Sequence, residues 1–181
     1  MGQYIILTCQ VLFFSGVIWS NLFHFKHSNR TNSYIAIIKI VGAILILDNL
    51  YLSFTDTNVE LWQTAVGLIL IMSAGTLFFW AIYANYSEPL SFAFTHLEKE
   101  NFMKKGPYHF IRHPIYAAYT YGWIAGIVLH LSWALALLSI IMVSLYHKAS
   151  LKEEETLISG PHKKEYLLYK ERTGLYWPRF F

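Results

Sequence analysis

The sequence has few charged residues and a single cysteine. Only 14% of its 181 residues are Asp, Glu, Lys or Arg, whereas a soluble domain carries about a quarter. Cys9 alone excludes a disulfide framework and a metal site built from cysteines. The sequence also lacks metal-ligand spacing, a phosphate-binding loop and a nucleophile triad, and nothing in it indicates nucleic-acid binding. We therefore expect no metal and no nucleic-acid partner.

Apolar residues make up 55% of the chain and gather in long runs. Runs of about twenty residues match the thickness of a hydrocarbon core, and residues 4–23, 34–54 and 61–83 are of this kind. After a long polar segment, residues 115–131 and 133–146 form two shorter runs that meet at a tight tip. We predict an all-α, polytopic membrane protein with about five transmembrane helices, the last two forming a hairpin that leads into a helical C-terminal tail.

The basic residues predict how the chain lies in the membrane. Every Lys and Arg falls in the first loop, the long polar segment or the tail, except Lys39 at the adjoining end of the second span. The N-terminus, the acidic turn at residues 55–60 and the hairpin tip hold none. Because Lys and Arg are enriched on the cytoplasmic side, we predict an outer N-terminus and a cytoplasmic tail, even if the hairpin only dips into the bilayer. The membrane would be the inner membrane of a bacterium or the endoplasmic reticulum of a eukaryote.

A polar, ring-rich segment, GPYHFIRHPIY at residues 106–116, runs directly into the fourth apolar run. Pro114 suits the first turn of a helix, which leaves His113 at the cap and a positive dipole end able to attract ligand carboxylates or hydroxyls. His113 and Tyr116 share one helix face, and Arg112 adds a rigid cationic fork beside them. The same residues would also suit a helix anchored at a membrane surface, and the residues alone leave both interpretations open.

A second polar cluster, Lys152-Glu153-Glu154-Glu155, follows about forty residues later at the far end of the hairpin. If the hairpin folds back on itself, the two clusters meet at one membrane surface. Acidic residues near a helix C-terminus oppose the helix dipole, and a cationic ligand at the surface would offset that cost. The alternative is a solvated helix end without a ligand.

Taken together, GPYHFIRHPIY, the hairpin, the glutamate run and the later EYLLYKER segment resemble the isoprenylcysteine carboxyl methyltransferase family and its phospholipid methyltransferase relatives. These are small integral membrane enzymes that use S-adenosylmethionine. The resemblance covers about residue 100 to the C-terminus. We expect a single integral domain with two parts. Residues 1–84 would form three transmembrane helices, and residues 85–181 a methyltransferase-like cofactor-binding region. The resemblance implies cofactor contacts from Glu100, Phe102, Met103, Tyr108, His113, Pro114, Ile115, Tyr116 and Glu154.

The family's acidic pair aligns with this sequence in two ways. Counting forward to Leu157 gives Glu153 and Glu154, whereas counting back from Tyr166 gives Glu154 and Glu155. Glu154 belongs to both alignments and is the acid that we expect to hold the cofactor.

Two departures from the family pattern bear on the acceptor. Ala118 stands where the family has glycine, and only Lys148 could replace an arginine that faces the substrate. Lysine lacks the bidentate fork of arginine, which argues against a prenylcysteine carboxylate. We predict catalytic or orienting roles for Arg112, Lys148, Glu155 and Arg172.

We therefore predict methyl transfer from S-adenosylmethionine to a lipophilic acceptor that arrives from the surrounding membrane lipids, with S-adenosylhomocysteine as the second product. The acceptor would be an isoprenylcysteine-like carboxylate or another lipid or isoprenoid thiol, phenol or amine. Two alternatives stay open, an NADPH-dependent membrane reductase of the sterol-reductase type, which shares a similar Arg-His-Pro-x-Tyr helix start, and a non-enzymatic membrane scaffold.

Overall fold

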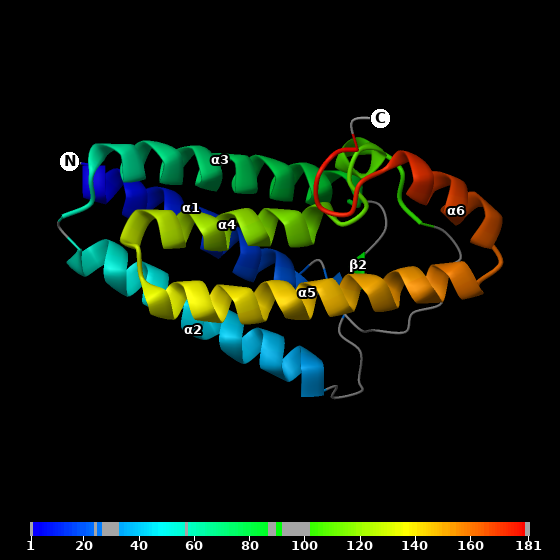
Figure 1. Ribbon diagram of the computed structural model, residues 1–181, viewed down its shortest axis with the longest axis horizontal. Coiled ribbons are helices and arrows are strands. Elements are labelled where there is room, and N and C mark those ends of the chain that lie inside the picture. Colours follow the sequence, from blue (N-terminus) through cyan, green and yellow to red (C-terminus); the bar gives the residue numbers. More distant parts are fainter. Residues whose placement is uncertain are drawn as a thin grey trace.

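The computed structural model describes residues 2–23, 25–26, 33–56, 58–86, 90–91 and 102–179. Long helices lie side by side, and a shorter helix crosses one end of the bundle (Figure 1). The helices are α1 Gly2–Phe23, α2 Ser33–Thr55, α3 Leu61–Ala84, α4 Pro114–His130, α5 Trp133–Ser159 and α6 Lys163–Arg172. A 3-10 helix, η1, spans Gly106–His109, and two short strands, β1 Phe25–Lys26 and β2 Leu90–Ser91, pair in parallel.

Within the part of the chain that the structure describes, four helices, α1, α2, α3 and α5, are long and apolar enough to cross a membrane. The fourth apolar run forms α4, which has 17 residues and a length of about 25 Å. The predicted helical architecture with candidate membrane spans is therefore confirmed, while the exact number of spans and the side on which the tail lies stay predictions. The division into residues 1–84 and 85–181 also remains a prediction.

The hairpin is formed by α4 and α5, which run in opposite directions (Figure 1). Leu131 ends α4 in the left-handed conformation (φ 46°), and the Ser132 side chain caps α5 by accepting from the amide of Leu135 at 3.4 Å. Two residues therefore suffice to reverse the chain. Helix α5 does not stop near residue 146 but continues to Ser159, as expected from the charged residues that extend it beyond the apolar run.

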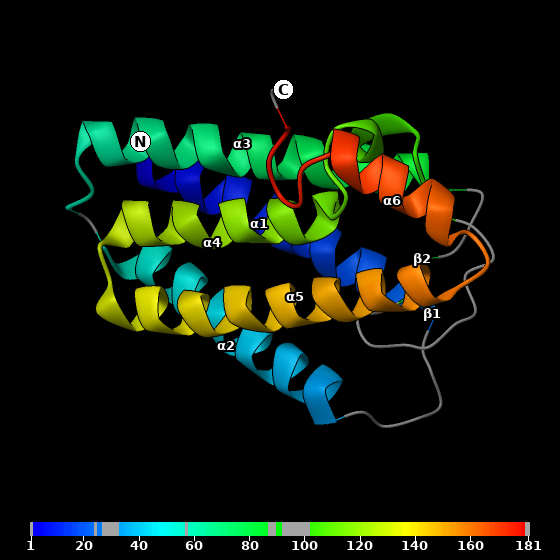
Figure 2. The ribbon, with the colours of Figure 1, turned by 45° about the vertical axis from the view of Figure 1, so that its right-hand side comes forward.

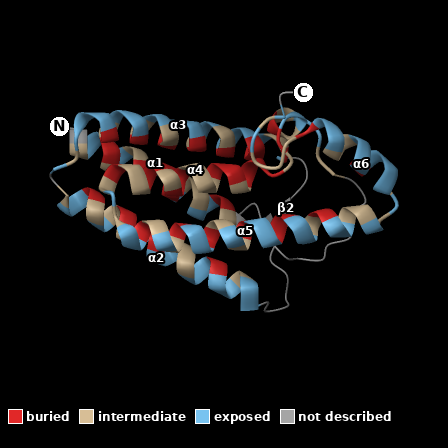
Figure 3. Cartoon of the chain, in the orientation of Figure 1, coloured by how far each residue is buried: buried red, intermediate tan, exposed pale blue. Residues whose placement is uncertain are grey.

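Small residues let α4 lie in the middle of the bundle, where most of its surface is buried (Figure 3). Its Ala117, Ala118 and Ala125 are fully buried, and small side chains allow membrane helices to approach closely. At Gly126 the backbone meets α2 so closely that an added Cβ would lie 2.0 Å from the Asn49 Oδ1 atom.

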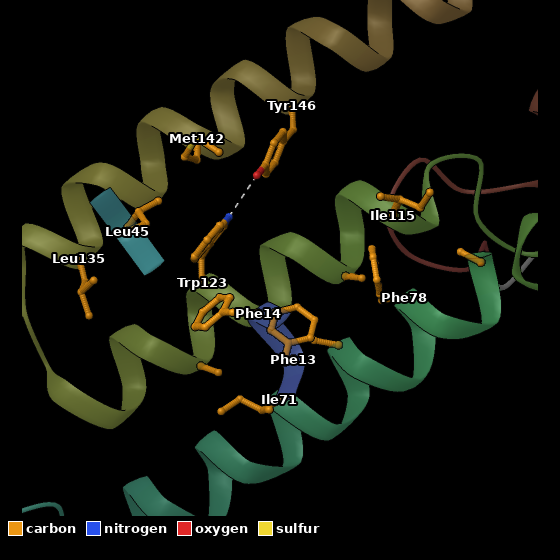
Figure 4. Packing of buried hydrophobic residues seen from close by; sticks show 14 of the residues in the cluster. Phe13, Phe14, Leu45, Ile71, Phe78, Ile115, Trp123, Leu135, Met142 and Tyr146 are labelled. Carbon is orange, nitrogen blue, oxygen red and sulfur yellow. Dashed lines mark hydrogen bonds between the residues drawn. The ribbon is translucent and has the colours of Figure 1, made fainter. Parts of the chain in front are cut away.

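The bundle core is rich in aromatic rings that come from several helices (Figure 4). Phe14 of α1 stacks on Trp123 of α4 with ring centroids 5.6 Å apart, and the Trp123 indole N–H donates to the Tyr146 hydroxyl of α5 at 3.4 Å. Outward-facing apolar residues such as Ile40 and Leu47 of α2 are exposed, as expected of a surface in contact with lipid. The ring contacts hold α4 and α5 together beside the polar end of the hairpin.

The crossing at Gly126 gives a first prediction. Gly126→Ala should lower the free energy of unfolding by about 1–3 kcal/mol, because the new methyl group overlaps Asn49. Gly75→Ala is the matched control, since a Cβ there meets no atom within 4 Å. Thermal unfolding in detergent measures both, and equal midpoints would contradict the close α2–α4 crossing.

Candidate functional site

Backbone hydrogen bonds hold the loop before α4 against the C-terminal residues. The amide of Arg112 donates to the carbonyl of Gly174 (2.8 Å), and the amide of Gly174 donates back to Phe110 (3.1 Å). A Cβ on Gly174 would lie 1.6 Å from the carbonyl oxygen of Trp177, so this tight turn requires glycine. Residues 173–177, which we call the C-terminal strap, therefore lie against the start of α4, as the red segment of Figure 2 shows.

A buried ion-pair group, which we call the clasp, joins three distant parts of the chain. Glu154 of α5 is 2% exposed and accepts from Arg112 Nε at 2.7 Å and from Lys170 Nζ of α6 at 2.5 Å. Arg112 Nη1 also donates to the carbonyls of Lys170 and Thr173. Because both oxygens of Glu154 are engaged by cations, this carboxylate holds the strap and α6 beside the start of α4.

Glu153, the preceding residue, faces the N-terminal end of α4 and is 30% exposed. Its Oε1 accepts from the Tyr116 hydroxyl at 2.7 Å, and its Oε2 lies 3.7 Å from His113 Nδ1. His113 is buried, with Nε2 3.5 Å from Glu154 and outside good hydrogen-bond geometry. Glu153 is thus the partly accessible acid of the site, next to a buried histidine nitrogen that can take a further partner.

Three nearly parallel rings lead from the N-terminal end of α4 into the bundle. His113 stacks on Tyr116 (5.8 Å, 19°), and Tyr116 stacks on Tyr146 of α5 (5.3 Å, 13°). Tyr176 of the strap stands edge-on to His113 at 6.4 Å, and its hydroxyl lies 3.0 Å from Ser150 Oγ of α5. We call His113, Tyr116, Glu153, Tyr146 and Tyr176 the His113 cluster.

Tyr108 of η1 lies next to this cluster. Burial raises the pKa of its phenol well above the ordinary value, and the nearby charge of Glu153 acts in the same direction. Its carbonyl accepts from the Tyr169 hydroxyl of α6 at 2.6 Å. The Tyr108 side chain is also hydrogen-bonded with Asn85, which partly offsets the rise of its pKa, and the bond from Tyr169 ties the Tyr108 backbone to α6.

The structure brings some of the predicted site residues together and leaves others apart. Five of them meet at the N-terminal end of α4: Tyr108, Arg112, His113, Tyr116 and Glu154. The side chains of Lys148, Glu155 and Arg172 are exposed. The structure places none of these three in contact with the His113 cluster, within the described residues. Their catalytic roles stay predictions.

The remaining predicted residues are apolar, apart from Glu100. Pro114 and Ile115 are buried in the first turn of α4. Phe102 packs against the rings of Tyr166 (5.0 Å) and Tyr169 (5.1 Å) on α6. Two residues complete this set, Met103, which is half-buried, and Glu100, which lies outside the described residues.

Sequence reasoning missed two contributors, Lys170 and Tyr176. Lys170 lies one turn after Tyr166, which is 2% exposed, so the helical repeat could have placed it on the inward face of α6. Tyr176 belongs to no helix or strand, so no periodic pattern in the sequence could have placed its ring beside His113.

A family model described as phospholipid methyltransferase matches residues 62–164, which is more than half of the chain. The chain belongs to this family. The match covers α3, α4 and α5, including Arg112, His113, Glu153 and Glu154, whereas Lys170 and the strap lie beyond it. No curated protein matches the chain significantly. The predicted family is confirmed, and with it a membrane methyltransferase class whose members generally use S-adenosylmethionine.

The clasp gives a prediction for Glu154. Glu154→Gln removes the charge between Arg112 and Lys170, and breaking a buried pair in this way should cost about 3 kcal/mol of stability. Hydrogen exchange of the Arg112 and Gly174 amides should accelerate as the strap loosens. Glu155→Gln, at the exposed neighbouring position, should leave exchange unchanged. Equal protection in the two variants would contradict the clasp.

Proposed function

We propose that the chain transfers a methyl group from S-adenosylmethionine to a lipophilic acceptor that reaches the His113 cluster from the bilayer. One observation carries the proposal. The His-Pro-x-Tyr helix start and the glutamate run, which are far apart in sequence, meet within the family-matched region through the Tyr116–Glu153 hydrogen bond. The positive-inside pattern further supports a site on the cytoplasmic face.

The residues of the cluster suit a cationic methyl donor. Arg112 and Lys170 both pair with Glu154, so the carboxylate left to meet the ligand's ammonium or sulfonium is Glu153. This supports Glu153 as the ligand contact and Glu154 as the residue that positions Arg112. The ring faces of Tyr116 and Tyr176 can cover a flat base or a cation. Bound S-adenosylmethionine would supply an activated methyl group, and the protein's task would be alignment and exclusion of water.

The charges around the cluster favour a neutral or cationic acceptor. A carboxylate acceptor would face Glu153, while Arg112 and Lys170 are engaged with Glu154. Lys148, the suggested replacement for the family arginine, is exposed on α5. An amine, thiol or phenol would instead need a group that accepts a proton, and His113 and Glu153 are in place for this. We therefore propose an amine, thiol or phenol ahead of an isoprenylcysteine-like carboxylate.

The two alternatives fit the site less well. An NADPH reductase would bring nucleotide phosphates to a cluster whose accessible charge is the Glu153 carboxylate. A scaffold would not need a partly exposed acid hydrogen-bonded to a ring at the start of a buried helix. Family membership favours the methyltransferase over both.

Ligand binding tests the donor. Titration calorimetry of the detergent-purified chain should show binding of S-adenosylhomocysteine in the micromolar range and none of NADPH. Glu153→Gln should weaken that binding about tenfold or more, because it removes a charged hydrogen-bond acceptor, whereas exposed Glu155→Gln should not. Binding of NADPH alone would indicate a reductase, and binding of neither ligand would indicate a scaffold.

A matched acceptor series tests the substrate class. Lipids with one common prenyl chain and an amine, thiol, phenol or carboxylate head would be offered with labelled S-adenosylmethionine. We expect labelled product from the first three heads and a kcat/KM for the carboxylate lower by about tenfold or more, since Glu153 opposes it. A preference for the carboxylate that is lost in Lys148→Ala would overturn this choice and restore the role first expected of Lys148.

A further inference from the structure

An open pocket of about 460 Å³ lies between α6 and the C-terminal strap. Three cationic side chains line it, Arg112, Lys170 and Arg179, together with the apolar Leu167 and Leu175. His113, Tyr116 and Glu153 are not among its lining residues. The pocket is therefore distinct from the His113 cluster, although it shares Arg112 and Lys170 with the clasp.

The cations of the pocket are held in place and still have donors for an anion. Arg112 is fixed by Glu154 and by carbonyls of α6 and the strap, and Arg179 Nη1 donates to the Glu171 carbonyl at 2.8 Å. A guanidinium has five donors and an ammonium three, so these bonds do not exhaust either group.

The charge balance of this region favours an anionic ligand. Three cations of the pocket face two carboxylates, Glu154 of the clasp and Glu171 on the lining, which leaves one net positive charge. From Lys163 to Arg179 the sequence carries five basic and two acidic residues. Phosphate is a fitting partner, because arginine binds it through two parallel hydrogen bonds.

The pocket lies at the level expected for lipid headgroups. The strap touches the start of α4, and its Trp177 packs on Tyr121 of that helix at 4.9 Å while staying 61% exposed. Tyr83 and Tyr86, at and just after the C-terminal end of α3, are also exposed. Exposed tryptophan and tyrosine side chains gather at membrane–water interfaces. Leu167 of α6, which lines the pocket, is itself an exposed apolar side chain.

We propose that this pocket binds the phosphate of an anionic phospholipid headgroup, at a lipid site separate from the methyl-transfer site. The cations would contact the phosphate, and the exposed Leu167 and Trp177 would meet the glycerol and acyl region. A bound phosphate would add a second anion between Arg112 and Lys170 and so strengthen the attachment of the strap.

Native mass spectrometry of the detergent-solubilised full chain tests this site. Titration with dioctanoyl phosphatidylglycerol should give a saturable adduct, and dioctanoyl phosphatidylcholine should bind more weakly because its choline adds a positive charge. Arg179→Gln should weaken phosphatidylglycerol binding about tenfold, and Arg179→Lys should retain more of it. Lys163→Gln, which removes an exposed charge at the other end of α6, is the control and should bind normally.

Two results would overturn the lipid site. Displacement of the lipid by millimolar inorganic phosphate, with equal affinity for the two, would indicate a general anion site. Equal weakening of lipid binding in Arg179→Gln and Lys163→Gln would indicate diffuse charge attraction. Thermal midpoints measured without lipid show whether Arg179→Gln is folded, and lipid binding is measured independently of methyl transfer.

Discussion

The arrangement of the segments around the start of α4 depends on the burial of Glu154. A carboxylate that is 2% exposed is costly unless cations accompany it, and removing one partner leaves an uncompensated charge. Arg112, from the loop before α4, and Lys170, from α6, must therefore both be present when α5 packs. One buried charge thus sets the relative positions of three segments, and the accessible face of the neighbouring Glu153 follows from it.

The unequal lengths of the hairpin helices decide where the site forms. Counting from the turn at Leu131, α4 reaches its first residue after 17 residues, whereas α5 continues for 27. The glutamates therefore lie about one turn, or about 5 Å, beyond Pro114, beside Arg112 and His113. Because this juxtaposition needs only an antiparallel hairpin, it was predictable from the positions of Pro114 and the glutamate run.

The face of each glutamate was harder to predict. Three successive helix residues point about 100° apart, and the family pattern allowed two alignments. The buried series Met142, Tyr146 and Ala149 sets the helix phase and turns Glu153 and Glu154 inward, away from the exposed side of Glu155. That phase depends on how α5 packs against α4. In the sequence, only the small side chain of Ala149 indicated this packing. The strap is attached by backbone hydrogen bonds, which carry no side-chain pattern, so its position could not be predicted.

In the proposed function, the clasp would also separate the task of holding the site from that of binding the ligand. If Glu154 contacted the donor, each binding event would draw its carboxylate away from Arg112 and Lys170, and the strap would loosen in each cycle. With Glu154 committed to the clasp, Glu153 can gain and lose a ligand while the backbone stays fixed, because its own partners are the Tyr116 hydroxyl and the nearby His113. In the proposed function, the family-matched core would carry the transfer site, and residues beyond 164 would enclose it and link it to the membrane surface.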